Sequence, residues 1–151
     1  MANIRKAEPS DIPRILELYH QLSITTAPSE LNIKVSHEYY RTILDRINNF
    51  PGMSLLVAAV DGEVVGSLVL VIVPNLAHRG LPWAVVENVI VDESRRRSGI
   101  GRLMMEYAVT EAKKAGCYRI SLDSNNVRKD AHKFYELLGF KGSSIGFRMS
   151  L

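Results

Sequence analysis

Two long apolar runs separated by a two-residue turn constrain the fold of this chain more than any other feature. Residues 53–60 read MSLLVAAV, residues 63–73 read EVVGSLVLVIV, and Asp61-Gly62 stands between them. An Asp-Gly pair suits a tight turn with left-handed backbone, so the two runs predict a β-hairpin. Because neither run alternates with polar residues, both faces of the hairpin must be covered by other elements.

Four segments with apolar residues at helical spacing would provide that cover. The first is expected at residues 10–22, with Ser10 as its N-cap and Pro13 in its first turn. The third is expected to begin after Gly99 and to end at Gly116. The expected core faces of the four helices are, in order, Ile12, Ile15, Leu16, Tyr19 and Leu22; Tyr40, Ile43, Leu44 and Ile47; Ile100, Leu103, Met104, Tyr107, Ala108 and Ala115; and Ala131, Phe134, Tyr135 and Leu138.

The remaining strand candidates define one domain over residues 1–151. They are NIRKA near the start, WAVVENVIV at 83–91, CYRISL at 117–122 and SIGFRMSL at 144–151, and residues 23–35 read as a long irregular connection. The order β-α-α-β-β-β-α-β-α-β predicts an α/β domain in which helices cover a single mixed sheet.

Composition excludes several classes of function. Of the 151 residues, 46% are hydrophobic, and 19 basic against 16 acidic residues leave a formal charge of +3, too small an excess for a nucleic-acid-binding face. The single cysteine, Cys117, excludes an internal disulfide and is expected to be packed, and no histidine spacing resembles a metal site. The sequence begins without an apolar signal core and contains no run of about 20 apolar residues, so we expect a cytoplasmic protein that is not inserted in a membrane.

An arginine-rich turn precedes the third predicted helix. Residues 95–104 read RRRSGIGRLM. The first N–H groups of a helix have no partners within the helix, and glycines at positions 99 and 101 would let a phosphate approach them, with Arg95, Arg96, Arg97 and Arg102 nearby. The window alone fits a solvated arginine run equally well. It contains neither Gly-Lys-Ser/Thr nor G-x-G-x-x-G, because position 104 is Met.

Two longer stretches give this window a family context. VIVDESRRRSGIGRLMMEYAV, with Arg96-x-x-Gly99-x-Gly101, and GCYRISLDSNNVRKDAHKFYELLGF together resemble the GNAT superfamily of acetyl-CoA-dependent N-acetyltransferases. The resemblance covers nearly the whole chain and is weakest over residues 23–50. It implies an α/β fold with a single mixed, mostly antiparallel sheet of about six or seven strands and four flanking helices. It also implies acetyl-CoA as cosubstrate and no metal.

The resemblance assigns cofactor contacts to particular positions. Ile90 and Val91 would pair their backbone with the pantetheine arm, and the arginines would meet the outer phosphates. The residues expected to hold the pyrophosphate, mainly through backbone amides, are Arg96, Arg97, Ser98, Gly99, Ile100, Gly101 and Arg102.

Two residues are candidates for the chemistry. Tyr135 matches the family's tyrosine and is the candidate general acid, although its spacing also fits a core stripe. Glu87 is a carboxylate in an otherwise apolar strand and is the candidate base, since burial would raise its pKa toward the working range. The alternatives for Glu87 are an ion-paired or edge-exposed glutamate. A bulge, usual in the family, leaves open whether Glu87 or Asn88, through a bound water, faces the cleft.

The resemblance implies direct transfer of acetyl from acetyl-CoA to a primary amine of a small molecule, by an enzyme expected to be a homodimer. Subgroups acting on aminoalkylphosphonates, aminoglycosides and glucosamine 6-phosphate have similar motifs. Arg128 stands where the family often has asparagine, which leaves the roles of Asn125 and Asn126 open, and Arg128 or Arg79 could bind an acceptor's phosphate. The alternatives are a protein N-terminal or lysine acetyltransferase and a non-catalytic acyl-CoA-binding module.

Overall fold

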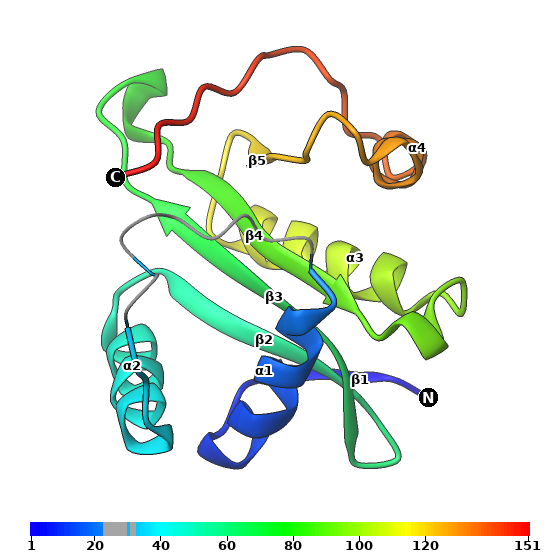
Figure 1. The fold of residues 1–151 in the computed structure, drawn as a ribbon. Helices are drawn as coiled ribbons and strands as arrows, with labels where there is room; N and C mark the ends of the chain where they lie inside the picture. The colour runs from blue at the N-terminus through cyan, green and yellow to red at the C-terminus, as the bar shows by residue number, and fades with distance from the viewer. Residues whose placement is uncertain (23–29, 31–32) are drawn as a thin grey trace.

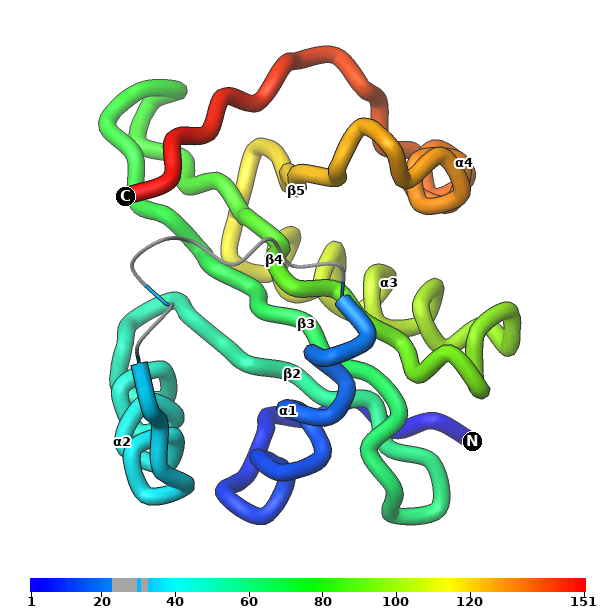
Figure 2. The backbone as a smooth tube through the Cα atoms, viewed as in Figure 1, coloured from blue at the N-terminus to red at the C-terminus, as the bar shows by residue number. Residues whose placement is uncertain are grey.

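The chain folds around one mixed sheet (Figures 1 and 2). The structure, a computed structural model, describes residues 1–22, 30 and 33–151. Its strands are β1 (Asn3–Lys6), β2 (Met53–Val60), β3 (Glu63–Val73), β4 (Trp83–Val91) and β5 (Ile120–Leu122), in the spatial order β1-β2-β3-β4-β5. All neighbours are antiparallel except β4 and β5, which are parallel. The expectation of six or seven strands is wrong for the described residues, which form five.

The predicted hairpin is confirmed as β2 and β3. Asp61 and Gly62 both have positive φ, 50° and 83°, and Val60 faces Glu63 across the turn. Such backbone matches the right-handed twist of the two strands. As the unbroken apolar runs require, one face of the hairpin packs into a cluster around Leu68 and Leu70, and the other packs into a cluster around Val57 and Val69.

Four α-helices cover the two faces, as predicted. They are α1 (Ile12–His20), α2 (His37–Asn49), α3 (Ile100–Lys114) and α4 (Lys129–Leu137), and short 3-10 turns span Pro9–Asp11, His78–Gly80 and Glu93–Arg95. Helices α1 and α2 lie on one face of the sheet, and α3 lies on the other (Figure 1). Apolar residues of α4 pack onto the cluster that α3 forms with the sheet.

The cap and core face of two helices differ from expectation. Ser10 is not the N-cap of α1 but lies in a 3-10 turn, where Glu8 and Asp11 cap each other's backbone. In α1 the fully buried residue that the prediction missed is Leu18. In α3, Leu103 and Ala115 are exposed, and the buried stripe is Ile100, Met104, Met105, Ala108 and Ala112. Its spacing of four residues means that α3 crosses the strands at an angle, so the stripe drifts around the helix.

The end of the chain also differs from expectation. The strand predicted at 117–122 is reduced to β5. Just before it, Tyr118 donates its N–H to the Pro82 carbonyl and stacks on His78 with 3.9 Å between ring centroids. Residues 144–151, predicted to be a strand, pair with no strand. With three residues, β5 offers this segment little edge on which to build a ladder. The expected connection at 23–35 lies largely outside the described residues. None of the helices in the described ranges is long and apolar enough to cross a membrane.

A buried carboxylate joins the end of β4 to α1. Asp92 is 6% exposed, and its Oδ1 accepts hydrogen bonds from the Ser94 N–H at 2.8 Å and the Ser94 hydroxyl at 2.6 Å. Its Oδ2 pairs with Arg14, which also donates to the Val64 carbonyl at 3.1 Å. The Ser94 hydrogen bonds, together with Arg14, hold the pKa of Asp92 at about 2.

We predict that Asp92→Asn destabilises the domain in a pH-dependent way. Because the pKa of Asp92 is depressed in the folded state, its contribution is complete above the unfolded pKa of about 4 and is lost as pH falls toward about 2. Urea unfolding at pH 7 should show a loss of about 1–2 kcal/mol, and the difference from the parent should narrow below pH 4. The exposed Asp45→Asn should change little at either pH. A pH-independent loss at position 92 would contradict the role of the charge.

Candidate active site

The parallel pairing of β4 with β5 ends early and leaves an open edge. Ala84, Val85 and Val86 pair with β5, but the rest of β4, from residue 87 to 91, pairs only with β3. At this point β4 carries the expected bulge: Asn88 has a φ of +51°, and the register places Leu68 opposite two residues of β4. An asparagine tolerates this left-handed backbone better than a β-branched residue. The open edge of β4 beyond Val86 is called the split below.

The register determines which backbone groups face the split. Asp92 donates its N–H to the Val65 carbonyl at 2.8 Å, so its backbone groups point toward β3. Along a strand the backbone groups of successive residues point alternately to the two neighbouring edges. Ile90, which lies opposite Ser67, therefore directs its backbone groups to β3. Val91 directs its N–H and carbonyl into the split, where the Arg96 Nε already reaches the carbonyl at 3.4 Å. Of the two positions expected to pair with pantetheine, only Val91 has the geometry for it; the side chain of Ile90 is buried.

Helix α3 begins beside the split with an open N-terminus. Its N-cap, Gly99, has a φ of +85° and provides no side-chain cap, whereas α2 is capped by Ser36, which accepts from the Tyr39 N–H at 3.1 Å. Arg97 is also left-handed, with a φ of +63°. A Cβ built on Gly99 would meet no atom within 4 Å. The first N–H groups of α3 therefore face free space at the positive end of the helix dipole, which is the arrangement of an anion site.

Gly101 has a different role from the one expected. A Cβ at this position would lie 3.3 Å from the Phe134 ring and 3.6 Å from the side chain of Val91. The missing side chain thus lets α4 approach α3 closely; it does not simply clear a path for a phosphate. Gly101 fixes the position of the helix that carries Tyr135.

Positive charge surrounds the N-terminus of α3. The side chains of Arg95, Arg96, Arg97 and Arg102 are exposed, and of these Arg102 lies 3.7 Å from Glu106 in a solvent-exposed pair. Such an exposed pair contributes little to stability. Arg95 and Arg97 have no ion pair among the described residues, and Arg96 and Arg102 make only weak contacts, so the local field of this turn is positive.

Tyr135 lies on α4 and packs against the core, as one of its two expected roles requires. Its ring is half-buried against the core cluster. The centroid of this ring lies 5.2 Å from the centroid of the Phe134 ring and 6.0 Å from the centroid of the Phe140 ring. Burial raises the pKa of its hydroxyl, and the charge of Arg128, the N-cap of α4, only partly offsets that rise. The hydroxyl therefore keeps its proton at physiological pH and can donate it.

Glu87 is exposed, so the expectation of a buried carboxylate is wrong. It lies opposite Val69, and residues directly opposite in a sheet share a face. Val69 belongs to the cluster that packs against α1 and α2, whereas Tyr135 packs on the α3 side. The two candidate catalytic groups thus approach the split from opposite faces of the sheet. Asn88, the alternative to Glu87, is also exposed.

A buried polar contact behind the bulge was missed by sequence reasoning. Ser67 is completely buried in β3, and its hydroxyl has no hydrogen-bond partner of regular geometry. Burial raises the pKa of the Tyr19 hydroxyl on α1, and the neighbouring Ser67 hydroxyl partly offsets that rise. The one available signal in the sequence was a serine in the middle of an apolar strand.

Several other candidates have structural roles. Burial raises the pKa of the half-buried Cys117 thiol, which suits packing and not nucleophilic attack. The Asn125 side chain accepts from the Val127 N–H at 3.1 Å and so shapes the turn before α4. Within the described residues, no group of three His, Cys, Asp or Glu side chains could hold a metal ion.

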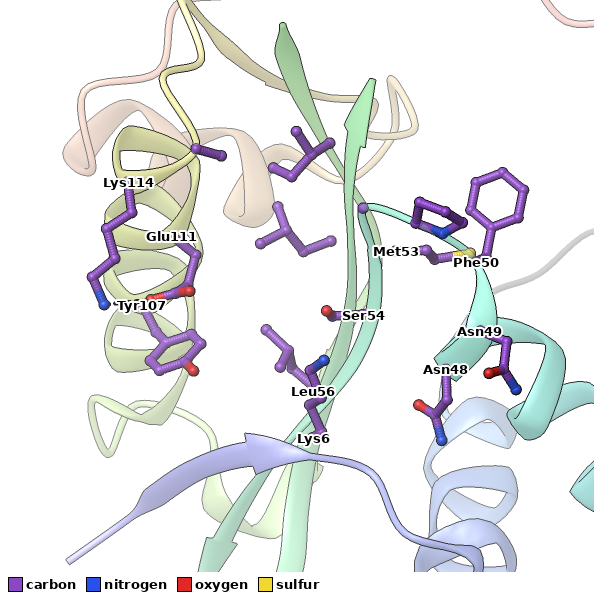
Figure 3. A pocket seen from close by; sticks show the side chains of 15 residues that line it. Lys6, Asn48, Asn49, Phe50, Met53, Ser54, Leu56, Tyr107, Glu111 and Lys114 are labelled. Atoms are coloured by element: carbon purple, nitrogen blue, oxygen red, sulfur yellow. Dashed lines mark hydrogen bonds and ion pairs between the residues drawn. The ribbon is translucent and has the colours of Figure 1, made fainter. Parts of the chain in front are cut away.

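A cavity of about 520 Å³ lies away from the split (Figure 3). Tyr107, Glu111 and Lys114 of α3 line one side of it, and Ser54 and Leu56 of β2 line the other. The Lys114 ammonium is paired with Glu111 at 2.7 Å. This cavity contains neither of the candidate catalytic residues nor any residue of the arginine-rich turn.

Comparison with known proteins agrees with this geometry. The chain is 33% identical over 90 residues to a glucosamine 6-phosphate N-acetyltransferase of Trypanosoma brucei brucei, covering 60% of this chain and 59% of that protein. It is 33% identical over 101 residues to an aminoalkylphosphonate N-acetyltransferase of Salmonella typhimurium, covering 67% and 65%. The matches thus span about 60% of the length of these relatives.

A solved acetyltransferase structure from Trypanosoma brucei superposes with a TM-score of 0.84 at 28% identity and covers 100% of both chains. The model of the acetyltransferase (GNAT) family matches residues 16–140, which include the split, the arginine-rich turn and most of the four helices. The chain therefore belongs to the GNAT acetyltransferase family.

Proposed function

We propose that this enzyme transfers acetyl directly from acetyl-CoA to a primary amine of a small molecule. The observation that carries the proposal is the open edge of β4 beside the uncapped N-terminus of α3. An extended pantetheine arm is recognised by main-chain hydrogen bonds, as an added strand would be. A pyrophosphate is recognised by helix N–H groups. The two features lie end to end, joined by residues 92–99.

The residues present fit acetyl-CoA. The N–H groups of Ile100, Gly101 and Arg102, with the turn at Arg97 and Ser98, would hold the pyrophosphate, and the open space beside Gly99 would admit it. The Arg96 guanidinium would then be free to leave the Val91 carbonyl and meet a phosphate. Val91 would offer its N–H and carbonyl to the pantetheine amides. The acetyl group would then lie in the split.

The chemistry of acetyl transfer defines a task for each candidate. Near pH 7 only roughly one in a thousand lysine-like amines is neutral, so the acceptor must lose a proton, which Glu87 would take directly or through water. The oxyanion that develops on the acetyl carbonyl needs a donor, and a strand amide near Val91 would supply it. The departing CoA thiolate gains a proton from Tyr135. Because the base and the acid act from opposite faces of the sheet, acceptor and leaving group do not compete for one space.

The relatives narrow the choice of acceptor. Their names specify amines that carry a phosphate or a phosphonate. Two cations suit such a group: Arg128 at the N-cap of α4, and Arg79 in the loop after β3, which is held at a φ of +60°. We therefore place small phosphorylated or phosphonylated amines ahead of protein amines.

An acceptor screen tests the proposal. Thiol release from acetyl-CoA should be measured with glucosamine 6-phosphate, glucosamine, an aminoalkylphosphonate and a peptide with a free N-terminus. We expect release with the phosphorylated or phosphonylated amines and much less with glucosamine. Release with the peptide alone would favour a protein acetyltransferase. Binding of acetyl-CoA without release across a broad amine library would favour a non-catalytic module.

We predict that Ser98→Glu weakens acetyl-CoA binding by at least roughly tenfold without unfolding the domain. The new carboxylate would lie among the first N–H groups of α3 and oppose the charge of the incoming phosphates. Thr110→Glu makes the same charge change on an exposed position of the same helix and is the matched control. Isothermal titration calorimetry with CoA measures both. Equal affinities for the two variants would contradict the phosphate site.

We predict that Tyr135→Phe lowers kcat by roughly 10²-fold or more and leaves the KM for acetyl-CoA nearly unchanged. The substitution keeps the ring that packs between Phe134 and Phe140, so the thermal midpoint should stay close to that of the parent. A steady-state titration of acetyl-CoA at saturating acceptor separates the two parameters. If kcat remains near the parental value, Tyr135 is a packing residue only.

We predict that Glu87→Gln changes the shape of the pH–rate profile. Activity should fall strongly at about pH 7 and recover in part at about pH 9–10, where more acceptor is already neutral. Burial raises the pKa of Tyr135, which postpones the loss of the acid as pH rises. Glu136→Gln, on the exposed side of α4, is the control. If the Glu87→Gln variant keeps the pH–rate profile of the parent, Glu87 is not the base, and a water bound at Asn88 becomes the candidate.

A further inference from the structure

A serine hydroxyl lies inside the apolar core between the sheet and α1. Ser67 is completely buried, and its Oγ has no hydrogen-bond partner of regular geometry among the described residues. Burying such a hydroxyl lowers stability, whereas an apolar side chain of the same size avoids that cost. Alanine would fill nearly the same space at this position. The hydroxyl therefore needs an explanation other than packing.

This hydroxyl is on the face of the sheet that carries Glu87. Ser67 lies opposite Ile90 on β4, and Val69, two residues further along β3, lies opposite Glu87. Residues directly opposite share a face, and so do alternate residues along a strand. Gly66 has the other orientation, since a Cβ there would lie 2.8 Å from a side-chain sulfur of α3. Ser67 and Glu87 thus belong to neighbouring residue pairs on the side of α1 and α2.

Tyr19 on α1 lies beside the buried hydroxyl. Helix α1 packs on β3 and β4 (Figure 1), and the Tyr19 ring joins the apolar cluster on that face. The Tyr19 and Ser67 hydroxyls are neighbours, and burial raises the pKa of the phenol, which therefore stays protonated. The Gln21 side chain accepts from the Glu93 N–H at 2.9 Å and so ties the end of α1 to the end of β4. Because Tyr19 is only partly buried, its side chain connects Ser67 with the surface on this face.

We propose that the Tyr19 hydroxyl contacts the acceptor amine and that Ser67 is a positioning residue that acts through Tyr19. The acceptor meets Glu87 on this face under the proposed function, on which this inference rests. A primary amine that attacks the acetyl carbon must direct its lone pair at that carbon, and its N–H groups then need hydrogen-bond acceptors. The Glu87 carboxylate is one such acceptor, and the phenol oxygen of Tyr19 is the second.

The direction of the hydrogen bond between the two hydroxyls determines what Tyr19 offers to the amine. A phenol is a stronger acid than an aliphatic alcohol, so it is the better donor of the two. On this assignment Tyr19 donates to Ser67, and its oxygen keeps a lone pair for an N–H of the amine. Without the Ser67 hydroxyl, the phenol proton would be free to turn toward the amine and oppose that contact. Ser67 thus orients the acceptor without touching it.

The first test compares stability with activity in Ser67→Ala. The thermal midpoint should equal that of the parent or exceed it, because a buried hydroxyl without a partner is removed. The kcat/KM for the amine acceptor should nevertheless fall by roughly tenfold, and the KM for acetyl-CoA should stay nearly unchanged. A purely structural role predicts the opposite result, a lower midpoint with parental kinetics of the folded enzyme.

The second test removes the Tyr19 hydroxyl alone and together with that of Ser67. Tyr19→Phe should lower kcat/KM for the same acceptor by roughly 10- to 100-fold and leave the affinity for CoA unchanged in calorimetry. The double variant Tyr19→Phe/Ser67→Ala should match Tyr19→Phe alone, because Ser67 acts through Tyr19. Tyr40→Phe is the matched control: this tyrosine of α2 is partly buried against the same cluster, and its variant should keep the parental kcat/KM.

The outcomes separate this inference from the proposed function. If the parent transfers acetyl to none of the screened amines, the proposed function fails and the inference fails with it. If the parent is active, parental kcat/KM in either single variant overturns the inference alone. So do a lowered thermal midpoint in Ser67→Ala and losses that add up in the double variant.

Discussion

The early end of the pairing between β4 and β5 is the constraint on which the rest of the site depends. Three residue pairs hold the two strands together, and beyond Val86 the backbone of β4 is free on one side. A bulge at Asn88 shifts the alternation of residues along β4 by one position. As a result, the Glu87 side chain lies on the face of α1 and α2, and Val91 directs its backbone groups into the split. Without the parting, β4 would have no free edge beyond Val86. Without the bulge, the backbone direction at Val91 would be reversed relative to Glu87.

Asp92 makes this edge rigid at its far end. It accepts two hydrogen bonds from Ser94, which start the turn toward α3, and it pairs with Arg14 on α1. The arginine-rich turn and α1 are therefore tied to one carboxylate. Buried ion pairs of this kind contribute modestly to stability but penalise any structure in which one partner is left alone. That penalty favours a single position of α1 relative to the arginine-rich turn.

The sequence was sufficient for most of the architecture. Unbroken apolar runs around Asp61-Gly62 determine a hairpin with two covered faces, and RRRSGIG after a strand determines an open helix N-terminus, because both depend on local chemistry. The parts that failed depend on non-local geometry. Periodicity could not show that a one-residue bulge leaves Ile90 bonded to β3 and Val91 free. It could not show that Gly101 faces Phe134, and apolar neighbours in the strand did not imply burial of Glu87. The predicted strand at 144–151 has the right alternating pattern, but the neighbouring edge strand β5 is only three residues long.

The position of Tyr135 shows how little of α4 is held by burial. No residue of this helix is fully buried, and its contacts with the rest of the domain are made by partly buried aromatic and aliphatic side chains. The contact of Phe134 with the bare backbone of Gly101 allows α4 to lie close to α3, and the Phe134 and Phe140 rings lie edge-on to the Tyr135 ring. Because no residue of α4 is fully buried, displacing this helix would expose little of the core. Tyr135 therefore lies on an element that the rest of the domain holds only through partly buried contacts.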